Sequence, residues 1–183
     1  MSSLELRDVI TTGLYWIDSP WPGRLAIAAR PRGGDWLEDD ISAWRHAGVD
    51  VVLSLLTRDE AEELDLTREP DLCRAKGIRF LTFPIPDRHV PGSKTEADNW
   101  LARVAELLQA GQNVVIHCRQ GIGRSGMIAA ALLVSNGTSP GEAFQRISDA
   151  RGVAVPETTE QKEWVRHFLK PVAASPIALR DSR

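Results

Sequence analysis

The 183-residue sequence predicts an α/β fold with a central, mostly parallel sheet of about five strands and helices on both faces. Short β-rich runs alternate with helical patterns along the chain, and three of those runs are nearly continuous apolar stretches. The length suits one domain with a substantial core. We therefore expect an N-terminal segment over 1–12, a single domain over 13–170, and a disordered tail over 171–183.

Five runs rich in β-forming residues are the predicted strands. In chain order they are 14–17, 25–28, 49–56, 78–85 and 114–118. The last three are the apolar stretches, and strands of this kind are typically covered on both faces. In such sheets ligands bind beyond the carboxyl ends of the strands. Cys118 and Asp87 both follow apolar strands directly, so we expect them to meet at one edge.

Two helices are predicted around the last strand. Ser93-Lys94-Thr95-Glu96 has the pattern of a capping box, and the helix that it opens ends at Gly111. Its apolar face comprises Ala97, Trp100, Leu101, Val104, Leu107 and Leu108. Residues 126–136 are apolar nearly all round, which predicts a buried helix.

Two more helices complete the predicted domain. Ser139-Pro140-Gly141-Glu142 is a second capping-box pattern, with proline at the first helical position. Its helix should bury Ala143, Phe144 and Ile147. A last helix over about 157–169 should turn Trp164, Val165 and Phe168 inward, before Pro171 stops it.

Composition and charge narrow the class of protein. Apolar residues make up 43% of the chain and charged residues 26%, as in ordinary globular proteins. The net charge of −3 argues against a general nucleic-acid binder and a polybasic membrane anchor. The longest apolar run, 127–134, is too short to span a bilayer. Two cysteines form no disulfide framework, so we expect a cytoplasmic protein. No membrane partner is expected, and a monomer is favoured.

The segment from His117 to Ser125 carries the chemistry. A buried strand ends at Cys118, a loop with two glycines follows, and Arg124 and Ser125 open a helix. Five residues between the cysteine and the arginine let successive backbone N–H groups converge on one point. Such a nest at a helix N-terminus binds a phosphate-like anion. Arg124 can close the nest with a bidentate fork, above the sulfur of Cys118.

This H-C-x5-R-S segment resembles the signature of the cysteine-dependent protein phosphatases. Within them, the chain is most similar to the compact dual-specificity branch and its kinase-associated type. The resemblance extends to Pro84-Ile85-Pro86-Asp87, to residues 138–143, to Asp149-Ala150-Arg151-Gly152 and to the stretch around Gln161. It implies the cysteine-phosphatase fold, a phosphoprotein substrate, and no cofactor or metal. The implied phosphate-binding residues are Arg119, Gln120, Gly121, Ile122, Gly123 and Arg124.

Each residue of the loop has an expected role. Cys118 is the nucleophile, because the nest, Arg124 and the helix dipole all favour a thiolate there. Arg124 binds two non-bridging oxygens and stabilises the charge of the transition state. Ser125 donates a hydrogen bond to the sulfur and eases its departure. His117 orders the loop, by analogy with the family, and is interpreted as structural.

Asp87 is the predicted general acid. An alkoxide or phenoxide leaving group needs a proton, and a positioned carboxylic acid supplies it. Asp87 follows a strand and a proline, and the Pro-Ile-x-Asp resemblance supports the assignment. Asp59, Glu96 and Asp98 are the alternative acids, although the capping pattern already explains Glu96.

Two further residues have open roles. Gln161 matches a position where related enzymes carry a glutamine that orients the hydrolytic water. A T-x-x-Q capping box with Thr158 explains it equally well. Cys73 could trap oxidised Cys118 as a disulfide, but a buried position on a short helix is favoured.

The sequence leaves two substrate classes open, phosphoproteins and inositol phosphates or phosphoinositides. The acid follows Ile85-Pro86 rather than the Trp-Pro of classical tyrosine phosphatases, which favours a shallower, dual-specificity pocket. Arg88, His89, Lys94 and Arg119 could form a basic rim, so an inositol phosphate or phosphoinositide is the alternative substrate. A non-catalytic phosphate-binding module is disfavoured because the cysteine, arginine and acid are all present. The four histidines show no metal-ligand spacing.

Overall fold

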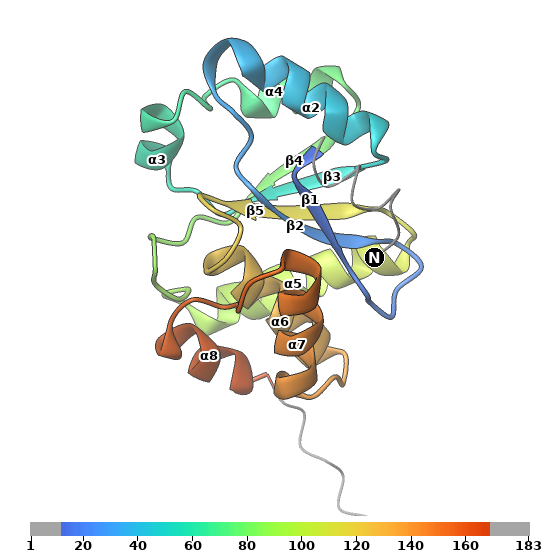
Figure 1. The fold of residues 1–183 in the computed structure, drawn as a ribbon, viewed down its shortest axis with the longest axis vertical. Helices are drawn as coiled ribbons and strands as arrows, with labels where there is room; N and C mark the ends of the chain where they lie inside the picture. The colour runs from blue at the N-terminus through green and yellow to red at the C-terminus, as the bar shows by residue number, and fades with distance from the viewer. Residues whose placement is uncertain (1–11, 169–183) are drawn as a thin grey trace, which may run out of the picture.

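The computed structural model describes residues 12–168, which form a five-stranded sheet between two layers of helices (Figure 1). The strands are β1 (Leu14–Ile17), β2 (Leu25–Ala29), β3 (Val51–Ser54), β4 (Arg79–Thr82) and β5 (Val114–Cys118). Their order across the sheet is β1-β2-β5-β3-β4, and only the β1–β2 pair is antiparallel. The predicted fold class is confirmed. The expected tail over 171–183 lies outside the described residues.

The helices divide between the two faces of the sheet. One layer contains η1 (Gly34–Trp36), α2 (Leu37–His46), α3 (Arg58–Glu63) and α4 (Glu69–Ala75). The other contains α5 (Lys94–Gln109), α6 (Arg124–Ser135), α7 (Pro140–Arg151) and α8 (Thr159–Arg166). Each layer encloses its own apolar cluster against the sheet, and α6, almost entirely buried, is the centre of the second. Within residues 12–168, none of the helices combines the length and apolar character needed to cross a membrane.

The third and fourth strands differ from their predicted extent. Pairing covers 51–54 and 79–82 rather than the whole apolar runs of 49–56 and 78–85. The expectation that all three apolar strands are covered on both faces is wrong for β4, whose Arg79 and Thr82 are exposed. β4 is the edge strand and pairs with β3 alone. The apolar residues that suggested full burial, such as Ile78 and Phe83, are buried but flank the paired segment.

Capping differs in detail from the sequence patterns. Ser93 and Ser139 cap α5 and α7 by accepting N–H bonds from Glu96 (3.2 Å) and Glu142 (3.3 Å). Neither helix start is a complete capping box, and the Glu142 carboxylate is bonded to Arg146 instead (2.6 Å). Reciprocal boxes are present before α3 and α8. The last helix, α8, is shorter at both ends than the predicted 157–169, and residue 169 lies outside the described residues.

Candidate active site

The loop between β5 and α6, residues 118–124, is here called the phosphate loop. It begins where the central, fully buried strand β5 ends, at the carboxyl edge of the parallel strands. Gly121 has a φ of +68°, and a β-carbon there would lie 2.5 Å from the backbone of Ala28 and Ala29. Only glycine fits such a position. The loop therefore curls tightly against β2.

Hydrogen-bond donors surround the sulfur of Cys118. The Gly121 N–H donates to Sγ over 3.3 Å, and the Ser125 hydroxyl oxygen lies 3.4 Å from Sγ. Ser125 is fully buried in the first turn of α6, so its hydroxyl is held at the sulfur. These donors, together with the N-terminus of a 12-residue helix, stabilise negative charge on Sγ.

The guanidinium of Arg124 is buried and held on several sides. Nη1 and Nη2 donate to the two carboxylate oxygens of Glu60 over 2.8 and 2.9 Å, and Nη1 also donates to the Ile85 carbonyl oxygen (2.8 Å). Nη2 lies 2.9 Å from Oδ1 of Asp87. Burial alone would lower the pKa of Arg124, but the Glu60 hydrogen bonds and the nearby negative charges raise it. The side chain is a fixed cation that faces the cavity.

Glu60 is the site residue that sequence reasoning missed. It lies on α3, where Thr57 and Glu60 form a capping box. The Glu60 carboxylate also accepts hydrogen bonds from the Arg124 guanidinium. Burial would raise the pKa of Glu60, but hydrogen bonds from Arg124 and Thr57 outweigh that effect and lower it. The T-x-x-E pattern from Thr57 to Glu60, which follows a predicted strand directly, indicates a helix start at the same edge of the sheet as Cys118. Asp59, considered as an alternative acid, is its neighbour.

Asp87 reaches the site from the segment that follows β4. A turn closed by the His89 N–H and the Pro86 carbonyl oxygen (3.1 Å) contains Asp87 and Arg88. Arg88 has a φ of +63°, in the left-handed region. The Asp87 side chain is 56% exposed and approaches the phosphate loop from outside. The structure thus brings Asp87 and Cys118 together at one sheet edge, as the parallel strands predict.

A small cavity of about 100 Å³ lies between these groups. It is lined by Asp87, Arg88, Cys118, Arg119, Gln120, Gly123, Arg124 and Glu157. Of the predicted phosphate-binding residues, Gly121 and Ile122 do not line it. The Gly121 N–H is already directed at Sγ, and Ile122 packs on the apolar core. The alternative acids lie elsewhere, with Asp98 paired to Lys94 on α5.

Gln161 lies between the phosphate loop and the Asp87 segment. It is fully buried, and its carbonyl oxygen accepts the Thr158 N–H (3.3 Å) as the capping box requires. Its amide nitrogen donates to the His89 carbonyl oxygen (3.3 Å). A β-carbon at Gly123 would lie 3.2 Å from its amide oxygen. The capping interpretation is confirmed, and the water-orienting role stays a prediction.

Arg151 is a second contributor that the sequence analysis left without a role. It belongs to the Asp-Ala-Arg-Gly stretch at the end of α7. Nε donates to the Gly121 carbonyl oxygen (3.0 Å) and Nη2 to that of Gln120 (3.2 Å). Its guanidinium also stacks on the Tyr15 ring, 4.2 Å from the centroid. Arg151 therefore fastens the outer side of the phosphate loop to α7.

Two buried groups lie behind the loop. His117, interpreted as structural, has Nε2 3.1 Å from Oε1 of Glu69, and both side chains are buried. Cys73 is fully buried on the short helix α4, as favoured. Burial, and secondarily the charge of Glu69, raises the pKa of Cys73 to about 12. Cys73 packs in the cluster on the α2–α4 face, whereas Cys118 packs in the other.

Comparison with known proteins identifies the family. Residues 26–138 match the model of a family described as the DSP-PTPase phosphatase of polymorphic toxin systems. The chain belongs to the dual-specificity phosphatases. This phosphatase is 31% identical over 150 residues to cyclin-dependent kinase inhibitor 3 of Rattus norvegicus, covering 80% of the chain and 69% of that relative.

Solved structures share the fold of this phosphatase. Kinase associated phosphatase, with its catalytic cysteine replaced by serine, superposes with a TM-score of 0.77 at 22% identity. That match covers 85% of this chain and 92% of the other. Tk-PTP in its active form has a TM-score of 0.71 at 30% identity, over 87% of this chain and 98% of the other. A dual-specificity phosphatase hydrolyses phosphate monoesters of proteins through a cysteinyl-phosphate intermediate.

Proposed function

We propose that Cys118, Arg124 and Asp87 carry the reaction of this phosphatase. One observation carries the assignment: the sulfur, the guanidinium and the carboxyl line one phosphate-sized cavity, with Arg124 and Asp87 2.9 Å apart. The Ser125 hydroxyl lies 3.4 Å from the sulfur, and the Glu60 carboxylate holds the Arg124 guanidinium in place. Arg119, Gln120 and Gly123 form the remaining walls.

The first step transfers the phosphoryl group to sulfur. The Cys118 thiolate attacks phosphorus, the P–S bond forms, and the P–O bond to the substrate breaks. Asp87, protonated at this point, gives its proton to the departing oxygen. Arg124 binds two non-bridging oxygens, and its fork holds the charge that spreads over the equatorial oxygens.

Substrate binding must rearrange one contact. The guanidinium edge that faces the cavity is partly occupied by Asp87. Phosphate oxygens replace Asp87 at Nη2, which frees the carboxyl to turn toward the leaving oxygen. Glu60, which does not line the cavity, stays bonded to Nη1 and Nη2 and keeps the orientation of Arg124 unchanged.

The second step returns the enzyme to its starting state. Asp87, now a carboxylate, takes a proton from water as the water oxygen attacks phosphorus and the P–S bond breaks. The Ser125 hydroxyl donates to the sulfur as it leaves. Gln161, between Gly123 and the His89 carbonyl, is proposed to orient this water.

Two features bear on the substrate class: the first favours dual specificity over phosphotyrosine alone, and the second favours phosphoproteins over inositol phosphates. In the described part of the chain, the residues that line the cavity include no aromatic side chain that would demand the length of phosphotyrosine. The expected basic rim is largely neutralised: Arg119 pairs with Glu63 (2.8 Å), Arg88 with Glu157 (3.3 Å) and Lys94 with Asp98 (2.9 Å). A polyanion gains little from cations that already have carboxylate partners.

The remaining expectations form part of the proposal. A catalytic thiolate needs a reducing compartment, which supports a cytoplasmic enzyme. The net charge of −3 supports an enzyme that binds neither nucleic acid nor a membrane through a basic surface. We propose that it acts as a monomer. Arg124 and the backbone nest supply the positive field, so we propose that no metal or other cofactor takes part.

One assay tests the proposal. Purified protein, with a chelator present, is given peptides carrying phosphotyrosine, phosphoserine or phosphothreonine, and inositol phosphates and phosphoinositides in parallel. We expect the three peptide classes to be hydrolysed within about one to two orders of magnitude of each other, or ~1.4–2.7 kcal/mol. A preference of several thousand-fold for inositol phosphates would contradict the substrate proposal. Turnover by Cys118→Ser at the wild-type rate would contradict the mechanism.

A further inference from the structure

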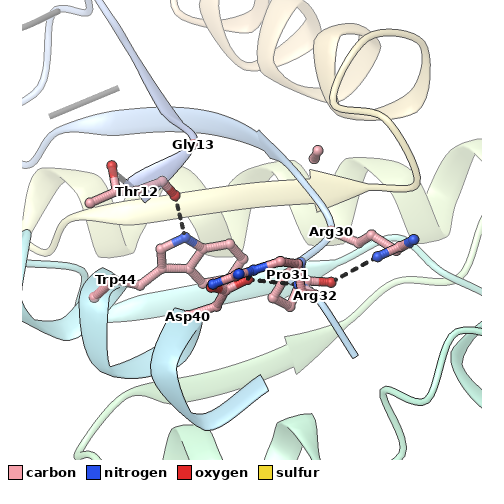
Figure 2. A pocket seen from close by; sticks show the side chains of 9 residues that line it. Thr12, Gly13, Arg30, Pro31, Arg32, Asp40 and Trp44 are labelled. Atoms are coloured by element: carbon pink, nitrogen blue, oxygen red, sulfur yellow. Dashed lines mark hydrogen bonds and ion pairs between the residues drawn. The ribbon is translucent and has the colours of Figure 1, made fainter. Parts of the chain in front are cut away.

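A second cavity opens beside the phosphate loop, at the same edge of the sheet. Its volume is about 330 Å³, and it lies between the start of β1, the end of β2 and helix α2 (Figure 2). Thr12, Arg30, Arg32, Asp40 and Trp44 are among the residues that line it. We call it the Arg30 pocket. No step of the proposed reaction uses it.

The Arg30 pocket adjoins the catalytic cavity through the backbone. Ala29, the last residue of β2, is paired with Cys118, and the Arg30 N–H donates to the Arg119 carbonyl oxygen (3.4 Å). Arg119 itself lines the catalytic cavity. In Figure 2 the Arg30 side chain extends away from the other labelled residues, past the end of β2. The backbone of Arg30 therefore lies directly beside the phosphate loop, next to a residue that lines the catalytic cavity.

Arg30 differs from the three arginines that line the catalytic cavity, because each of those has a carboxylate partner. Its guanidinium donates to the Pro31 carbonyl oxygen (3.1 Å), and no carboxylate within residues 12–168 pairs with it. Arg119, Arg88 and Arg124 all have carboxylate partners. Asp40, the acidic residue of the pocket, is occupied by Arg32 through its backbone N–H (2.7 Å) and its guanidinium (2.5 Å). Within the part of the chain that the structure describes, Arg30 thus presents a positive charge without a carboxylate partner.

The same segment exposes an aromatic side chain. Trp36 is 57% exposed, and the Arg32 guanidinium lies over its ring, 4.7 Å from the centroid. The segment is held in place because the Gly34 N–H donates to the Asp65 carbonyl oxygen (3.2 Å). Tryptophan and arginine are enriched among the residues that dominate protein interfaces. A polypeptide partner fits this surface better than a small solute.

We propose that Arg30 binds the carboxylate of an acidic residue close to the phosphorylated residue of a protein substrate. The enzyme then prefers phosphorylation sites with an aspartate or glutamate at one fixed neighbouring position. This inference rests on the proposed function and adds a specificity-determining residue to it. A partly exposed, charge-assisted hydrogen bond is worth about five- to twentyfold in kcat/KM.

The test uses pairs of phosphopeptides that differ by Glu against Gln at each position around the phosphorylated residue. The kcat/KM of each is measured for the wild type, Arg30→Gln and Arg24→Gln. Arg24 is a matched control because it precedes the opposite end of β2, is exposed, and stacks on Trp16 at 3.9 Å. Both variants change the net charge equally. Para-nitrophenyl phosphate, which lacks a neighbouring residue, reports on the chemistry alone.

At one position, we expect the kcat/KM of the wild type and of Arg24→Gln to be about five- to twentyfold higher for the Glu peptide than for the Gln peptide. For Arg30→Gln we expect this ratio to be less than about twofold. The preference should also shrink at high salt, because exposed charges are screened. A preference that survives in Arg30→Gln, or is absent from the wild type, would overturn the inference. So would an equal loss by Arg30→Gln on all substrates. Failure of the proposed function is separate, because it would appear as para-nitrophenyl phosphate turnover that does not need Cys118.

Discussion

Nη2 of Arg124 lies 2.9 Å from Oδ1 of Asp87, so the proposed phosphate-binding cation and the proposed acid contact each other before substrate arrives. The contact places the carboxyl where a phosphate oxygen must bind. Phosphate and Asp87 therefore compete for one edge of the guanidinium, while Glu60 holds the other edge. Removal of the Asp87 charge should affect binding and chemistry in opposite directions.

Asp87→Asn tests both effects. We expect kcat for poor leaving groups to fall by about 10²–10⁴, because the proton donor is lost, and activated phenols to be affected less. Inorganic phosphate should inhibit the variant at least as strongly as the wild type, since the competing carboxylate is gone. Asp98→Asn, whose carboxylate pairs with Lys94 on α5, is the control. Equal losses for all leaving groups would exclude Asp87 as the acid.

Glu60→Gln tests the support of Arg124. We expect kcat to fall by ~10–100-fold, because the guanidinium loses its fixed orientation. Loss of one partner of this largely buried pair should also cost about 3 kcal/mol in the free energy of unfolding. Urea unfolding and steady-state kinetics measure the two effects. Glu62→Gln, which removes an exposed partner of Arg58 on the same helix, is the matched control.

The Glu60 pair also has a predictable pH dependence. Folding lowers the pKa of Glu60 against the opposing effect of burial, so its carboxylate stabilises the fold above its ordinary pKa. That contribution is lost as the pH falls through the lowered pKa. Between about pH 7 and pH 3, the wild type should therefore lose more unfolding free energy than Glu60→Gln. Parallel pH profiles for the two proteins would contradict the assigned pair.

Gly121→Ala tests the curl of the phosphate loop. The added methyl group would meet the β2 backbone at 2.5 Å, on a residue with a φ of +68°, so the loop must move away from β2. We expect kcat to fall by about 10²-fold or more. Gly141→Ala, in α7 with open space around it, should leave activity unchanged and stabilise the fold by ~0.5–1 kcal/mol. Retained activity in Gly121→Ala would show that the close approach to β2 is unnecessary.

Cys73→Ser tests the redox alternative. Cys118, the proposed nucleophile, lines a cavity and should be oxidised by peroxide first to a reversible sulfenic acid, which inactivates the enzyme. Cys73 has a pKa raised to about 12 and packs on the other face of the sheet, so it should not trap the oxidised sulfur. We expect the wild type and Cys73→Ser to recover equally on addition of thiol. Lower recovery by the variant would establish Cys73 as a disulfide partner.

Local patterns predicted the parts of the site that belong to one segment. The spacing of Cys118 and Arg124 predicts the phosphate loop. Because Cys118 and Asp87 each follow an apolar strand, the sequence also predicts that they meet at one edge of the sheet. Arg151 and Arg30 were not predictable in this way, because their contacts join segments far apart in sequence. For Glu60, the T-x-x-E pattern indicates a helix start, but its pairing with Arg124 is again a contact between distant segments. The strand order, which leaves β4 at the edge, is likewise set by packing rather than by the apolar run.

The central claim is that the phosphoryl group passes through the sulfur of Cys118. The most direct measurement quenches a reaction with labelled phosphopeptide within one turnover and locates the label by mass spectrometry. Ser125→Ala, which removes the hydroxyl 3.4 Å from the sulfur, should slow breakdown of the intermediate and raise its yield. The account predicts one phosphoryl group on the peptide that contains Cys118, and none in Cys118→Ser. Turnover with no labelled protein, or with the label on another residue, would contradict it.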